Sequence, residues 1–246
     1  MATEYLLILE LFDYFIYTIP VYTLELLAAI AGSIFLAKNP ETYANTKYFV
    51  WYLWLTFVVE ILGAYAPILY FTDYKYFSFI EATRFVRNNW LYNLYFAISF
   101  SFYPIYFSGF LKEKSQKYML RLIALLFLVI AVVSFTISDT FFTEDSKFVN
   151  LVGTLMLLLS VIMFYFELLR SNLILNLKKF LPLYMSFGLI VFYLCVTPLT
   201  IFSQYFNAEN DTFVNLQVQI ILYSNLFMYS VFILGFISCS RKKKFY

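Results

Sequence analysis

The chain has 246 residues, of which 63% are hydrophobic and 13% are charged, and its formal net charge is +2. A soluble domain is about 45–50% apolar and ~25% charged, so this composition excludes a soluble globular fold and indicates a chain embedded in a lipid bilayer. The small net charge and the scarcity of polar residues also exclude a disordered chain and a nucleic-acid-binding protein.

The residue types needed for common catalytic and metal sites are missing. The chain contains no histidine, which excludes His-ligated haem, most zinc sites and the Ser–His and Cys–His catalytic pairs. It also lacks the GxSxG, HExxH, P-loop and CxxC motifs. We therefore expect a protein that is not an enzyme and that uses no cofactor and no metal ion.

Seven stretches are long and apolar enough to cross a membrane, since a spanning helix needs about 20 mostly apolar residues. They are Tyr14–Leu36, Tyr48–Phe71, Trp90–Phe110, Leu120–Ile137, Phe148–Leu168, Phe180–Ser203 and Phe213–Ser238. The connecting segments are too short for a second domain, and the apolar runs lack the alternating polarity of membrane barrel strands. The sequence thus predicts a single all-α domain over residues 1–246, a polytopic membrane protein with a seven-transmembrane-helix bundle.

The basic residues alternate between the loops as a seven-span topology requires. Cytoplasmic loops are enriched in Lys and Arg, and 13 of the 17 basic residues fall in or directly beside the first, third and fifth loops and in the C-terminal tail, Arg241–Lys244, with Arg121 counted at the start of the fourth span. Most of the acidic residues fall in the N-terminal segment and the other loops. We therefore expect a multi-pass protein of the inner cell membrane, with the N-terminus outside and the C-terminus inside.

Glu60 is the clearest candidate for a functional residue, because an ionisable side chain within a span is costly. It lies twelve positions after Tyr48, about 18 Å along a helix, slightly past the middle of the apolar layer. Two interpretations stay open: a protonated carboxyl that fastens helices together, or a contact with a proton, a cation or a ligand amine. Glu25 of the first span and Glu167 at the inner end of the fifth are predicted to be boundary residues that reach water or a headgroup, with Arg170 three residues after Glu167.

The last span is unusually polar in its first half. Asn215, Gln219 and Tyr223 are spaced by four residues and share one helix face, and Asn225 lies near the depth of Glu60. These side chains are expected either to join helices by hydrogen bonds or to line a polar pocket that opens outward. The candidate residues for a ligand or ion pocket are Glu60, Gln219, Tyr223 and Asn225.

Two further segments bear on helix arrangement. The amphipathic segment 77–89 is predicted as an interfacial helix outside the membrane, with the first turns of the third span as the alternative. In the first span, Ala28 lies four residues before Gly32, and Ala29 lies four before Ser33. Such pairs of small residues allow close helix contact, within one bundle or in a homo-oligomer.

The stretch from Ala28 to Ala64 contains Trp51, Trp54, Glu60 and Gly63. It resembles uncharacterised seven-span proteins of AT-rich bacteria, some of which are similar to stand-alone counterparts of the seven-span sensor regions attached to histidine kinases. The resemblance covers about the first two spans. It implies a sensor or accessory role and carries over no site residues.

The internal loops are too short to hold a kinase, cyclase or ATPase domain, so a signal would have to pass to a partner membrane or cytoplasmic protein. We expect a receptor-like sensor or an accessory subunit of a membrane signalling system, surrounded by the lipid bilayer. Two alternatives stay open: a transporter or channel for a small solute, proton or cation, and a membrane-perturbing defence effector. No inverted repeat is visible in the sequence to support a transporter.

Overall fold

The computed structural model describes residues 2–75, 78–202 and 211–240, and the side chains of 2–10, 13, 173–176 and 211–212 are also outside the description. Within these ranges the chain is all-α, as expected, and contains no strand. The long helices are α1 (Ala2–Lys38), α2 (Ala44–Gly63), α5 (Asn89–Ser108), α6 (Lys114–Ile137), α8 (Lys147–Leu169), α9 (Leu181–Ile201) and α10 (Asp211–Ser240). The short ones are α3 (Tyr65–Phe71), α4 (Ser78–Glu81), η1 (Arg84–Val86), α7 (Thr140–Thr143) and η2 (Asn172–Lys179).

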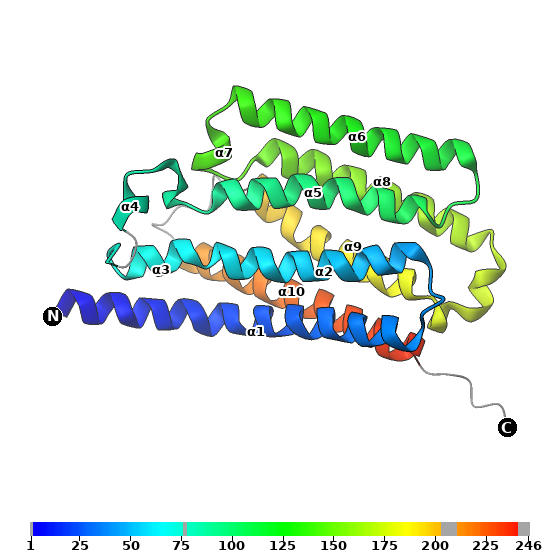
Figure 1. Ribbon diagram of the computed structural model, residues 1–246, viewed down its shortest axis with the longest axis horizontal. Coiled ribbons are helices and arrows are strands. Elements are labelled where there is room, and N and C mark those ends of the chain that lie inside the picture. The colour runs from blue at the N-terminus through cyan, green and yellow to red at the C-terminus, as the bar shows by residue number, and fades with distance from the viewer. Residues whose placement is uncertain (1, 76–77, 203–210, 241–246) are drawn as a thin grey trace.

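The long helices run side by side along one axis, so the bundle has two ends (Figure 1). We call the end where α1 begins, which also holds α7, the α7 end. The opposite end, where α1 stops, is the Lys38 end. The basic tail Arg241–Lys244 lies outside the described residues.

Six described segments are helical, long and apolar enough to cross a membrane. They are Tyr14–Lys38, Ala44–Phe71, Lys114–Ile137, Lys147–Leu169, Leu181–Ile201 and Phe213–Ser240. The third expected span forms α5 and is not among the six, because its sequence is less apolar. Its polar side chains are turned into the protein: Asn93, Ser99 and Ser108 are each 0% exposed. Six of the seven expected spans are therefore supported by length and composition, and α5 is a further long helix of the bundle with its polar side chains turned inward.

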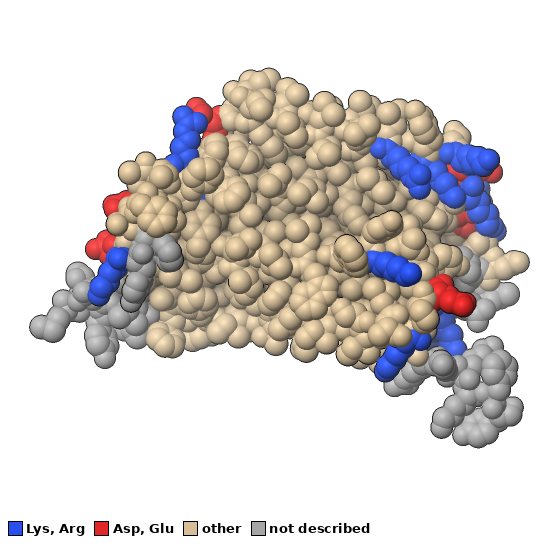
Figure 2. Space-filling view, viewed as in Figure 1, with Lys and Arg blue, Asp and Glu red and all other residues tan. Residues whose placement is uncertain are grey.

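The surface between the two ends is apolar. In the view of Figure 2, charged side chains gather at both ends of the bundle and the flank between them carries none. Leu125 and Ile130 of α6 and Val58 of α2 are each about half exposed on the outside of the bundle. An uncharged, apolar belt between charged ends fits a multi-pass membrane protein.

Six of the long helices form a closed ring. Each packs against the next in the order α1, α2, α5, α8, α9 and α10, and α10 packs back against α1. The remaining long helix, α6, stands outside the ring against α5 and α8 (Figure 1). The interior of this ring is therefore the place where polar side chains from distant parts of the sequence meet.

The second span is broken one turn after Glu60. Pro67 has no N–H to donate to the carbonyl four residues earlier, so the helix ends at Gly63 and α3 starts at Tyr65. The freed carbonyl of Gly63 accepts a hydrogen bond from Nδ2 of Asn88 at 2.8 Å. The break is therefore fastened by a side chain that lies just before α5.

Segment 77–89 does not form the first turns of the third span, and its described part is not one continuous helix. The described part forms the short helices α4 and η1, separate from α5, which begins at Asn89. The Tyr65 hydroxyl lies 2.6 Å from the carbonyl oxygen of Phe85 and 2.8 Å from that of Arg87, and Nε1 of Trp90 donates to it at 3.0 Å. This anchoring to α3 holds residues 85–87 away from a continuous helix.

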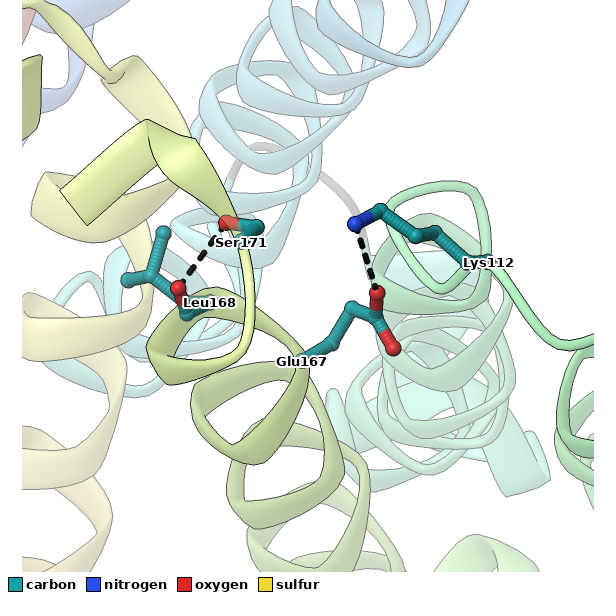
Figure 3. A network of polar contacts seen from close by, with 4 residues as sticks. All are labelled: Lys112, Glu167, Leu168 and Ser171. Atoms are coloured by element: carbon teal, nitrogen blue, oxygen red, sulfur yellow. Dashed lines mark hydrogen bonds and ion pairs between the residues drawn. The ribbon is translucent and has the colours of Figure 1, made fainter.

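At the Lys38 end, the loop after α5 is joined to the end of α8. Nζ of Lys112 lies 3.7 Å from Oε1 of Glu167, and the Ser171 hydroxyl donates to the carbonyl of Leu168 at 2.9 Å (Figure 3). Glu167 is thus a helix-end residue, as expected. Its ion-pair partner is Lys112 and not Arg170, because Arg170 lies beyond the last residue of α8.

Candidate functional site

A cavity of about 530 Å³ lies inside the six-helix ring. All six ring helices contribute to its lining, and α6 contributes none of the described lining residues. One lining residue from each helix in turn is Glu25, Glu60, Tyr95, Thr154, Thr197 and Asn225. The volume is within the range of small-molecule sites, about 300–1,000 Å³.

The cavity reaches the surface at the α7 end. Glu144, Asp145 and Lys147 line it there and are exposed. Loss of hydration raises the pKa of Asp145, the hydrogen bond from Asn89 at 3.2 Å opposes this, and the charge of Glu144 raises the pKa further. The mouth thus presents two carboxyl groups and one ammonium group.

Asn93 of α5 binds the backbone of the residues that form the mouth of the cavity. Its Nδ2 lies 2.9 Å from the carbonyl oxygen of Glu144, 3.1 Å from that of Phe141 and 3.4 Å from that of Thr140. Its Oδ1 accepts from the backbone N–H of Ser146 at 2.8 Å. One fully buried side chain therefore satisfies the backbone of α7 and of the turn into α8. Asn93 is not among the residues predicted from the sequence, although an Asn near the start of an expected span is a signal for a buried polar contact.

Towards the Lys38 end the ring is filled by aromatic side chains. The ring centroids of Phe49 and Tyr106 are 5.2 Å apart, and those of Phe107 and Phe164 are 5.3 Å apart. We call these four residues, all at most 2% exposed, the aromatic plug. On α5 the cavity lining stops at Tyr103, one turn before the plug. The cavity is therefore open at one end of the bundle and blind at the other.

One wall of the cavity is a cluster of hydroxyl groups from α2 and α5. The Tyr52 hydroxyl donates to Oγ of Ser99 at 2.9 Å and lies 2.9 Å from the hydroxyl oxygens of both Tyr95 and Tyr103. Oγ1 of Thr56 lies 2.9 Å from the Tyr95 hydroxyl. These bonds fix the tyrosine rings in place, so the wall is rigid.

Glu60 lines the cavity and has a polar partner. The Tyr92 hydroxyl donates to its Oε2 at 2.9 Å. Gly63 leaves room for this hydroxyl, since a Cβ there would lie 2.6 Å from the hydroxyl oxygen. Asn225 lines the same cavity, and its Nδ2 donates to the carbonyl of Ile221 at 3.0 Å. The structure therefore brings Glu60 and Asn225 to one cavity.

Gln219 and Tyr223 do not line the cavity. On α10 the lining residues at this level are Gln217, Ile221 and Asn225, which are spaced by four. Gln219 and Tyr223 lie two residues away from them, about 200° around the helix, and both are exposed. The structure does not place them beside Glu60, because α10 turns its Gln217 and Asn225 face towards the cavity.

Glu25 is a cavity residue and not the boundary residue that the sequence predicted. It is 2% exposed and lines the cavity from α1. Its Oε2 is buried and accepts no hydrogen bond from the described residues. A signal was present: Glu25 lies three and four residues before Ala28 and Ala29, so it shares their small-residue contact face, and both alanines are 0% exposed.

No known family, curated protein or solved structure matches this chain. The resemblance of the first two spans to sensor-type proteins is therefore left as an expectation. The site has to be interpreted from its own geometry.

Proposed function

We propose that the protein is a non-catalytic, receptor-like sensor of the membrane that binds a small molecule in the cavity. The observation that carries the proposal is the shape of this cavity, which opens at the α7 end and ends blind at the aromatic plug. A channel needs a path to both sides at once, which a cavity with a blind end does not provide. An alternating-access transporter also has a cavity closed at one end, so the blind end argues against a channel, and a transport assay distinguishes the receptor from a transporter.

The proposed topology has seven spans, with α5 as the third. Its 20 residues make a helix about 30 Å long, which matches the thickness of the hydrocarbon core. Lys38, Lys112 and Lys178 lie at the Lys38 end, which the positive-inside rule assigns to the cytoplasm. The N-terminus and the mouth of the cavity are then on the outer side of the inner membrane, and the C-terminus is on its cytoplasmic side.

Reporter fusions test this topology. Fusions after Lys114 and Lys178 should report a cytoplasmic location, and fusions after Asp145 and Asp211 should report an outside location. Paired alkaline phosphatase and green fluorescent protein reporters give opposite signals at each site and control for expression. An outside signal at Lys114 would contradict the seven-span arrangement, because α5 would then fail to cross.

Filling the cavity tests the receptor proposal. Val196 lines the cavity from α9, and Leu194 on the same helix is 57% exposed on the outside. We expect Val196→Trp to abolish the thermal stabilisation that a ligand gives to the purified protein, and Leu194→Trp, the matched control, to keep it. The probe panel is 2-phenylethylamine, 2-phenylethanol and 3-phenylpropanoate, which share a ring and a short chain but differ in charge.

The same protein in liposomes distinguishes a receptor from a transporter. Vesicles loaded with a pH-sensitive dye should gain no proton or potassium permeability from the wild-type protein. A permeability that the wild-type protein adds and that Val196→Trp removes would support the transporter instead. A panel without any binding that depends on Val196 would contradict the receptor proposal.

A further inference from the structure

Two carboxyl groups line the cavity without a basic side chain beside them. Glu25 and Glu60 both line it, and Lys147 is the one basic residue among the described lining residues. Lys147 is exposed at the mouth, close in sequence to Glu144 and Asp145. Two carboxylates in a poorly hydrated space repel each other, so a cation is needed for both to stay ionised.

The two glutamates differ in their hydrogen-bond partners. Oε2 of Glu60 accepts from the Tyr92 hydroxyl. The Tyr229 hydroxyl lies beside the Glu25 carboxyl, but Oε2 of Glu25 accepts from none of the described residues. With 2% of its surface exposed, Glu25 has almost no contact with bulk water. A buried carboxylate oxygen without a donor is costly, and a ligand N–H directed at it would remove that cost.

Aromatic rings form much of the wall of the same cavity. Tyr52, Phe100, Tyr103, Tyr193 and Tyr229 all line the cavity. The ring centroids of Phe100 and Tyr193 are 5.3 Å apart, and those of Tyr103 and Tyr193 are 6.3 Å apart. The faces of such rings attract cations and also provide an apolar surface for the body of a ligand. Because the Tyr52 and Tyr103 hydroxyls bond each other, their rings are oriented before a ligand binds.

We infer that the ligand is a small organic cation, a protonated amine whose ammonium group is held by Glu25 and Glu60 and whose apolar body lies against the tyrosine rings. The inference rests on the receptor proposal and names the ligand class of that site. A volume of about 530 Å³ fits an organic molecule and far exceeds a bare metal ion, whose oxygen ligands lie within about 2.6 Å. The described residues also contain no group of three or more His, Cys, Asp or Glu able to hold a metal. Glu144 and Asp145 at the mouth would attract a cation towards the cavity.

The experiment compares 2-phenylethylamine with its neutral analogue 2-phenylethanol and the anion 3-phenylpropanoate, by calorimetric titration of the full chain in lipid nanodiscs at neutral pH. The wild-type protein should bind the amine at least about tenfold more tightly than the alcohol, as expected for a charge-assisted hydrogen bond, and should not bind the carboxylate. Each ligand is also measured against Val196→Trp, so that binding in the cavity is separated from partitioning into lipid.

The variants Glu25→Gln and Glu60→Gln keep the shape of the side chain and remove its charge. Each should weaken binding of the amine by about tenfold or more and leave binding of the alcohol nearly unchanged. Glu167→Gln is the matched control, since Glu167 pairs with Lys112 away from the cavity, and it should bind the amine as the wild-type protein does. Unchanged binding of the alcohol by a variant shows that its cavity is still folded.

The outcomes separate the inference from the receptor proposal. If the alcohol or the carboxylate binds in a Val196-dependent way at least as tightly as the amine, the organic-cation inference is overturned and the receptor proposal stands. If the amine binds but both Gln variants bind it normally, the assignment to Glu25 and Glu60 is overturned. If none of the three probes binds in a Val196-dependent way, both proposals fall together.

Discussion

Replacing Asn93 with leucine should destabilise the folded protein by about 2–4 kcal/mol, since each buried polar group left without a partner costs about 1–3 kcal/mol. Asn93 is 0% exposed, so water cannot replace its hydrogen bonds to the carbonyls of Phe141 and Glu144 or to the N–H of Ser146. Leucine has a similar volume, so the loss reports the hydrogen bonds and not a cavity. The measurement is the free energy of unfolding from an SDS titration in mixed micelles.

The matched control is Asn215→Leu. Asn215 is an exposed asparagine of α10 near the same end of the bundle, and its substitution should change the free energy of unfolding by less than about 0.5 kcal/mol. We also expect Asn93→Leu to weaken ligand binding, because the mouth residue Glu144 is held through its carbonyl. An Asn93→Leu protein as stable as the wild type would show that the turn between α7 and α8 does not depend on this side chain.

Replacing Gly153 with alanine should destabilise the protein by about 1–3 kcal/mol, the usual cost of overpacking. A Cβ on Gly153 of α8 would overlap the ring of Phe100 on α5. The ring is 1% exposed and packs against Phe127 and Tyr193, so it has little room to move away. A loss of stability would identify overpacking, because in an exposed helix interior the change from glycine to alanine stabilises the helix by about 1 kcal/mol.

A double-mutant cycle gives the control for this prediction. Phe100→Ala removes Cγ and the ring, which are the atoms nearest to the added Cβ, so Gly153→Ala should cost less in the Phe100→Ala background than in the wild type. The same SDS titration measures all four proteins. Equal costs in both backgrounds would mean that the loss does not arise from contact between these two helices.

The pattern of apolar segments in the sequence was sufficient to predict an all-helical chain and the positions of its long helices. The expected span Phe148–Leu168, for example, corresponds to α8 within one residue at each end. Such segments are predictable because about 20 apolar residues form a helix in lipid whatever their neighbours are. The number of apolar residues does not decide whether α5, which covers the third expected span, crosses the membrane, since its polar side chains are buried against other helices.

Which polar residues meet was decided by the tertiary structure. A membrane helix is apolar on the lipid side as well as in the core, so its sequence pattern does not reveal which face turns inward. On α10, Gln219 and Tyr223 are spaced by four residues and share one face, and Gln217, Ile221 and Asn225 share another in the same way. The packing of α10 against α1 and α9 turns the face of Gln217 and Asn225 towards the cavity.

The two glutamates show the same difference between what the sequence predicts and what the packing of the helices decides. Glu60 could be identified from the sequence alone, because its depth in a span is read from chain position. For Glu25 the sequence offered only the small-residue face that it shares with Ala28 and Ala29, and its burial depends on how α1 packs against α2 and α10 in the ring. The partners Tyr92 and Asn93 likewise come from α5, distant in sequence from the groups that they bind. Hydrogen bonds between distant segments depend on how the six helices pack into the ring, and this packing cannot be predicted from the local sequence.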